Sequence, residues 1–194
     1  MVILLNVQYL NNFNPSIVKV KGESAPVGGG GTSMSMISVT LPDGSVNEYA
    51  SGITAGEIVI DIEGRKHDCV AALVDGQQKD FSSKLDSDCS VEGISGFTDD
   101  GIHILRHSAA HLLAQAVTSL YPNAKPTIGP AIDRGFYYDF ADLEDFGEAE
   151  LKVVQKKMHE IARRNLTVER VECTDSELNE LFSANPYKIE IIND

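Results

Sequence analysis

His107 and His111, four residues apart, are the residues of this sequence whose types and spacing best suit chemistry. On a helix, side chains at positions i and i+4 lie on the same face, so the two imidazoles would be neighbours. The spacing fits a metal site, acid–base or substrate-orienting work by groups that titrate near neutral pH, or a solvated helix face without a catalytic role. Spacing alone leaves these three interpretations open.

A metal site would need more ligands than the pair supplies. A catalytic zinc ion takes three protein ligands and a structural one takes four. The glutamate of HExxH proteases is also missing, because Ser108 and Ala109 occupy the two positions after His107. The side chains near the pair are small and should leave room above the imidazoles, which favours a cavity. These small residues are Ser108, Ala110, Ala114 and Thr118.

A second segment, from Ile128 to Asp139, could supply the floor of a pocket. Gly129 and Gly135 permit close backbone approach and sharp turns. Tyr137 and Tyr138 alternate along a strand, so one faces the core and the other the opposite side. One tyrosine hydroxyl could bind a ligand, or both rings could serve ordinary sheet packing. The nearby charged residues would pair with one another or cap turns: Asp133, Arg134 and Asp139.

The elements that position these residues follow from periodicity. Residues 102–120 should form a helix with the histidines opposite an apolar stripe made of Leu105, Ala109, Leu112, Ala116 and Leu120. Residues 147–165 predict a second amphipathic helix, with two strands across 126–140 between the helices. Beyond them we expect a strand over 166–172, a short helix after the capping box at 174–177, closed by Asn185-Pro186, and an edge strand over 187–192.

The pattern of residues 36 to about 94 predicts a separate unit, built mainly of strands. Alternating strands over 37–41 and 45–49 flank the turn Pro42-Asp43-Gly44, a capping box at 54–57 opens a helix, and strands follow over 69–74 and 89–94. This order suits a β-grasp, a sheet crossed by one helix. Upstream, Gly28–Gly31 reads as a flexible linker, and the natural start could be Met34 or Met36.

Composition limits the compartment and the partners. The net charge is −13, so no global field draws the chain to phosphates. Three scattered cysteines without a CxxC pair favour a reducing compartment, and residues 1–5 are too short an apolar run for a signal or spanning segment. We expect a cytoplasmic protein with no membrane partner. The basic cluster of residues 152–164 is a solvated helix face or a weak RNA-binding patch.

Two motifs together resemble a known family. Ile37–Ser45 resembles the opening of a TGS domain, the ubiquitin-like β-grasp module of threonyl-tRNA synthetases, certain GTPases and stringent-response enzymes. Arg106-His107-Ser-Ala-Ala-His111, Ile128-Gly-Pro130 and Gly135-Phe-Tyr-Tyr-Asp139 then resemble the second N-terminal domain of threonyl-tRNA synthetases. The resemblance implies an α+β chain with an N-terminal extension and linker over 1–35, a TGS domain over 36–97, and a C-terminally truncated editing domain over 98–194.

The resemblance also implies a site. In that family the second domain hydrolyses serine mischarged onto threonine tRNA, since one methyl group gives binding discrimination of only about 1–3 kcal/mol. His107 and His111 match the paired editing histidines, which position the ester and the attacking water. Tyr138 matches a pocket tyrosine, and Gly129 lies in the turn that lines the pocket. The implied partner is the acceptor end of threonine tRNA.

The sequence also departs from the family pattern. The family's editing site is completed by a CxxxH motif, whereas Cys173 is followed four residues later by Glu177 and no histidine follows His159. We expect no metal or cofactor here, because the family's ATP and zinc sites and its dimer interface belong to the absent catalytic part. The expectation is a part of a threonine–tRNA ligase that is inactive alone. A non-enzymatic tRNA-binding or regulatory module and a free-standing trans-editing hydrolase are the alternatives.

Overall fold

The computed structural model of the chain describes residues 2–6, 35–166 and 168–193. Two compact units divide it: Ser24–Leu105 forms one, and Met1–Glu23 with Arg106–Asp194 forms the other. The division falls inside the helix α3 (Asp99–Leu120). The predicted linker Gly28–Gly31 lies outside the described residues.

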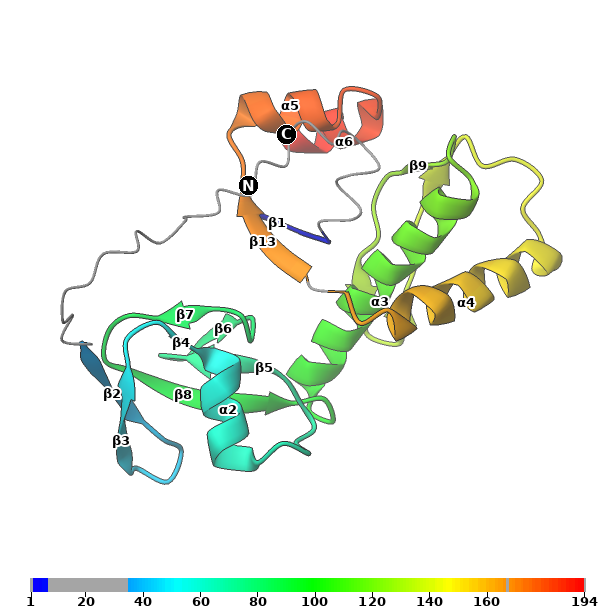
Figure 1. Ribbon diagram of the computed structural model, residues 1–194. Helices are drawn as coiled ribbons and strands as arrows, with labels where there is room; N and C mark the ends of the chain where they lie inside the picture. Colours follow the sequence, from blue (N-terminus) through cyan, green and yellow to red (C-terminus); the bar gives the residue numbers. More distant parts are fainter. Residues whose placement is uncertain (1, 7–34, 167, 194) are drawn as a thin grey trace. The chain divides into compact units, whose positions relative to one another are not determined.

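The unit Ser24–Leu105 is built on a five-stranded sheet of order β3-β2-β8-β5-β6, crossed by one helix (Figure 1). β2 and β8 run parallel, and the other neighbouring strands are antiparallel. Helix α2 (Ala55–Glu63) contacts β5 and β8. The strands are β2 (Met36–Thr40), β3 (Val46–Ala50), β5 (Cys69–Val74), β6 (Gln77–Lys79) and β8 (Cys89–Ser95), with β4 (Ile53–Thr54) pairing β7 (Lys84–Leu85) beside them. This is the predicted β-grasp arrangement.

Local sequence explains these elements. The alternation in β2 buries Ile37 and Val39 and leaves Met36 and Thr40 exposed. Thr54 and Glu57 form the predicted capping box at the start of α2, each side chain bonding the other's backbone N–H. The helix and sheet enclose one apolar core of Ile37, Val39, Ala55, Ile58, Val59, Ala72, Val74, Leu85 and Val91.

A close backbone crossing joins β8 to the first turn of α3. The Ser95 carbonyl oxygen accepts hydrogen bonds from the Thr98 amide at 3.1 Å and the Thr98 hydroxyl at 2.8 Å. The same hydroxyl oxygen accepts the Gly101 amide at 3.1 Å. Gly101 is buried, and a Cβ atom there would overlap the Ser95 carbonyl oxygen. The turn therefore depends on the missing side chain of Gly101.

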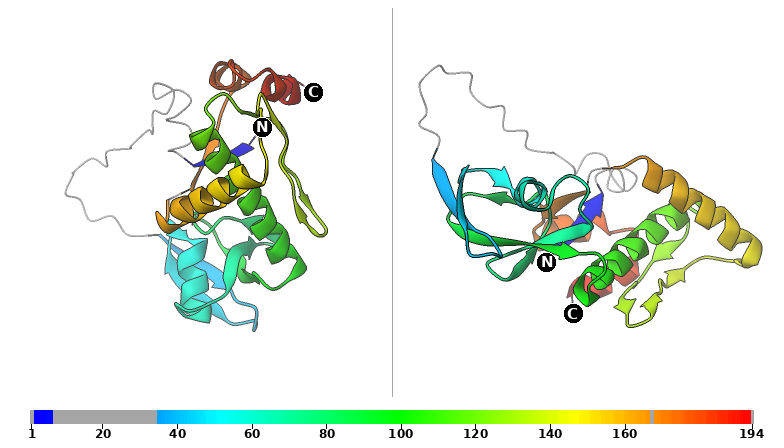
Figure 2. Two further views of the ribbon diagram at one scale, coloured as in Figure 1. Left: turned by 90° about the vertical axis from the view of Figure 1, so that its right-hand side faces the viewer. Right: turned by 90° about the horizontal axis from the view of Figure 1, so that it is seen from below.

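The second unit surrounds the rest of α3 with short strands and helices. Between α3 and α4 (Glu148–Arg163) the chain folds back on itself as a long hairpin (Figure 2). In the hairpin, β9 (Lys125–Pro126) pairs β12 (Phe140–Ala141), and β10 (Ala131–Ile132) pairs β11 (Gly135–Phe136). After α4 come β13 (Val168–Glu172), which pairs antiparallel with β1 (Val2–Asn6), then α5 (Asp175–Leu181) and α6 (Pro186–Asn193).

The buried face of α3 differs in part from the predicted stripe. Ala116 is buried as expected, and together with Val117 it packs against Val154 and Ile161 of α4. Leu105, however, is 47% exposed. Ala110 and Ala114, two of the small residues near the histidines, are buried and pack against neighbouring parts of the chain, whereas Ser108 is exposed.

The edge strand predicted over residues 187–192 is wrong, because these residues lie in helix α6. The sequence Asn185-Pro186 begins α6 and does not close the preceding helix, contrary to the expectation from sequence. Asn185 Oδ1 accepts the Lys188 amide at 3.3 Å, the bond of a helix N-cap. Proline is favoured at the first helical position because its missing N–H needs no partner there. Among the described residues, no helix is both long and apolar enough to cross a membrane.

Candidate functional site

The two histidines of α3 face each other as the spacing predicts. Their Nε2 atoms lie 3.0 Å apart, and the ring centroids are 4.6 Å apart at an interplanar angle of 71°. At this distance one Nε2 carries a proton and donates it, while the other presents its lone pair. Which of the two Nε2 atoms is the donor depends on the tautomers of the rings. Such an arrangement can accept a proton from water and return it.

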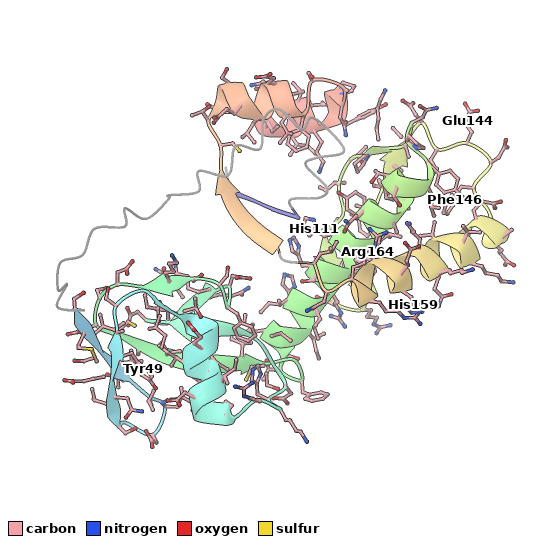
Figure 3. The ribbon with its side chains drawn as sticks, viewed as in Figure 1. Tyr49, His111, Glu144, Phe146, His159 and Arg164 are labelled. Carbon is pink, nitrogen blue, oxygen red and sulfur yellow. The ribbon has the colours of Figure 1, made fainter. Side chains whose placement is uncertain are left out.

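The surroundings keep His111 neutral. Figure 3 labels this side chain on α3, where the residue is exposed on the helix surface. Desolvation by neighbouring protein atoms, then the charges of His107 and Lys188, lower the pKa of His111 from 6.5 to about 4. Near neutral pH the His111 ring is uncharged.

Acidification is expected to destabilise this unit through His111. Its folded-state pKa lies below the ordinary value of 6.5, so the unfolded chain binds the proton more tightly. The stabilisation is present above pH 6.5 and is lost as the pH falls toward 4. Urea denaturation at several pH values should show a smaller loss for His111→Gln than for the unchanged chain. His159→Gln, at an exposed position of α4, is the control. If His111→Gln lost as much free energy of unfolding on acidification as the unchanged chain, the expectation would be contradicted.

Tyr138 and Gly129 are brought together by the hairpin. The Asp139 amide donates to the Ile128 carbonyl at 2.9 Å, and the Thr127 amide donates to the Asp139 carbonyl at 2.9 Å. These bonds lay Gly129 against the Tyr138 ring so closely that a Cβ atom would overlap the ring. Tyr138 stacks on Phe140 with centroids 4.9 Å apart, and its partial burial raises the pKa of the phenol.

One hydrogen bond ties the hairpin to the histidine helix. Arg106, which precedes His107, donates from Nη1 to the Ile132 carbonyl at 3.1 Å. Within the described residues, no hydrogen bond or ring contact joins either histidine to Tyr138. The structure thus forms two pairs, His107 with His111 and Gly129 with Tyr138, on elements that Arg106 links.

Lys188 is a residue of this region that the sequence analysis missed. It lies on α6, its charge acts on His111, and burial lowers the pKa of its ammonium group. Its helix was predicted as a strand, so no spacing rule connected it to His111, 77 positions earlier. The signal that could have found it is the Asn185-Pro186 helix start, which places Lys188 at the end of the first turn.

The other candidate residues form ion pairs or face the solvent. Glu160 on α4 pairs with Lys157 at 3.1 Å and Arg164 at 2.8 Å, so two members of the basic cluster are neutralised. Tyr137 points outward and is 47% exposed. Within residues 35–166 and 168–193, no three His, Cys, Asp or Glu side chains gather as a metal site would need.

Comparisons with known proteins agree with the fold. The TGS domain family matches residues 37–94, which run from β2 to β8. Threonine–tRNA ligase of Francisella tularensis subsp. tularensis (strain WY96-3418) is 41% identical over 161 residues, 81% of this chain and 25% of the relative. Threonine–tRNA ligase of Pelobacter propionicus (strain DSM 2379 / NBRC 103807 / OttBd1) is 44% identical over 164 residues, 83% of this chain and 26% of the relative. The chain therefore contains a TGS domain of β-grasp fold and is homologous to threonine–tRNA ligases over about a quarter of their length.

Proposed function

We propose that the unit of Arg106–Asp194 supplies the two histidines of an editing site that hydrolyses the ester of serine mischarged onto threonine tRNA. The observation that carries this proposal is the 3.0 Å contact between the Nε2 atoms of His107 and His111. Homology to threonine–tRNA ligases supports the substrate class. The partner is the acceptor end of threonine tRNA, in the cytoplasm.

The chemistry asks for a base and an oriented water molecule. A neutral imidazole lone pair accepts a proton as the water oxygen attacks the ester carbonyl. The bond between the acyl carbon and the ribose oxygen then breaks, serine leaves as the acid, and the ribose oxygen takes a proton. A low pKa at His111 keeps a lone pair present at neutral pH. Tyr138, lying on Gly129, provides a ring and a hydroxyl at the edge of the site.

We infer that these 194 residues alone hydrolyse the ester slowly, because the sequence holds no Cys-x-x-x-His. Binding should nevertheless be measurable with a seryl-adenosine analogue in which an amide replaces the ester. NMR titration should shift the ring resonances of both histidines and of Tyr138. His107→Ala should weaken binding about tenfold, a loss of roughly 1.4 kcal/mol. Exposed His159→Ala on α4 is the matched control.

The outcomes separate the three candidate functions. Binding that His107→Ala weakens, together with hydrolysis of seryl-tRNA near the rate in buffer, supports the proposal. Rapid hydrolysis that His107→Ala abolishes would replace it with a free-standing trans-editing hydrolase. Binding of threonine tRNA without any response to the analogue would replace it with a non-enzymatic tRNA-binding module.

A further inference from the structure

Asn185, just before α6, has a buried side-chain amide whose nitrogen and oxygen both form hydrogen bonds with backbone groups. It is 2% exposed and is the fully buried polar side chain among the residues whose exposure the structure describes. Burying an amide without partners costs about 1–3 kcal/mol. Here Nδ2 donates to the Pro126 carbonyl at 2.9 Å, and Oδ1 accepts the Lys188 amide at 3.3 Å.

These two bonds fasten one element to another. Pro126 lies on β9, opposite Phe140 of β12, so its carbonyl belongs to the base of the hairpin. The Lys188 amide belongs to the first turn of α6. The backbone is also fixed, because the Asn185 amide donates to the Phe182 carbonyl at 2.7 Å and the Asn185 carbonyl accepts the Lys188 amide at 3.1 Å. The start of α6 therefore cannot tilt without breaking the bond to β9.

The residue one turn beyond this fastening is Lys188. Its side chain is half-buried, and its positive charge is the smallest of the three causes that lower the pKa of His111. An ammonium group near an imidazole disfavours the imidazolium form and preserves a lone pair on nitrogen. Within the described part of the chain, the other charged group that acts on His111 is His107, from α3 itself. A shift of α6 would thus change the charge environment of the histidine pair.

We propose that Asn185 is a positioning residue that holds Lys188 beside the His107–His111 pair by fastening α6 to β9. Its contribution to ester hydrolysis rests on the proposed function, whereas the fastening itself does not. The hydrogen bonds of Asn185 go to Pro126, Phe182 and the start of α6 and not to either histidine, so it would act through Lys188.

The test is an NMR titration of the His111 ring in the 194-residue chain. Lys188→Met removes the ammonium group and should raise the pKa of His111 by roughly half a unit, the size expected for a screened charge several ångströms away. Asn185→Ser keeps a short acceptor for the helix cap but loses the donor to Pro126. It should raise the pKa of His111 in the same direction. The double variant should match Lys188→Met alone.

Asn179→Ser is the matched control, because Asn179 bonds the Asp175 carbonyl on the exposed side of α5. An unchanged His111 pKa in Asn185→Ser, beside a raised pKa in Lys188→Met, would make Asn185 merely structural and overturn the proposal. An unchanged pKa in Lys188→Met would overturn it too.

Should Asn185→Ser fail to fold, nuclear Overhauser contacts between the Lys188 side chain and the His111 ring in the unchanged chain decide. Their presence supports the placement and their absence overturns it. None of these readouts uses the seryl-adenosine analogue, so failure here is distinct from failure of the proposed function.

Discussion

Gly101→Ala is expected to destabilise the unit Ser24–Leu105, which contains the TGS domain and is called the TGS unit below, by about 3 kcal/mol, at the upper end of the usual cost of overpacking. A Cβ atom at this position would overlap the Ser95 carbonyl oxygen and lie 2.7 Å from the Ser95 carbonyl carbon and 2.9 Å from the Gly96 Cα. These are backbone atoms, so no side-chain rotation relieves the overlap. Alanine's higher helix propensity returns only about 1 kcal/mol.

The measurement is urea denaturation followed by NMR, with resonances from the two compact units tracked separately. Separate tracking is needed because a two-unit chain need not unfold in one step. His103→Ala is the matched control, since it places alanine two residues further on at an exposed position of the same helix. Its effect should stay within about 0.5 kcal/mol. A Gly101→Ala chain as stable as the unchanged one would contradict the close crossing.

Local patterns were sufficient for the TGS unit. Its turns, its alternating strands and the Thr54–Glu57 capping box are each signals carried by a few adjacent residues, and every one of them formed. The match of the family to residues 37–94 coincides with these elements. The pairing of His107 with His111 was equally predictable, because it depends only on helical spacing.

Tertiary packing decided what the sequence could not show. The apolar alternation of residues 187–192 resembled an edge strand, and a proline-started helix formed in its place because Asn185 could cap it and reach Pro126. That bond joins residues 59 positions apart, a separation that no periodicity rule detects. The placement of Lys188 depends on it in turn. The burial of Ala110 and Ala114 likewise reflects neighbours from elsewhere in the chain.

At the candidate site, Gly129→Ala is expected to have the largest effect. The added Cβ would overlap the edge of the Tyr138 ring and lie 2.7 Å from its Cγ, so the ring would leave its stack with Phe140. Overpacking of this kind costs about 1–3 kcal/mol. The obstacle is a side chain, which can move, so we expect about 2 kcal/mol, less than at Gly101. Affinity for the seryl-adenosine analogue should fall at least tenfold.

A double-mutant cycle isolates the contact. Tyr138→Ala removes the ring and carries its own cost, but Gly129→Ala added to it should cost less than about 0.5 kcal/mol, because nothing remains to overlap. Denaturation of the full chain, followed through the NMR resonances of residues 106–193, gives the free energies of unfolding of the two single variants and the double variant relative to the unchanged chain. Equal costs of Gly129→Ala with and without the Tyr138 ring would show that the glycine serves backbone conformation instead. In that case Gly129 would have no part in the proposed pocket.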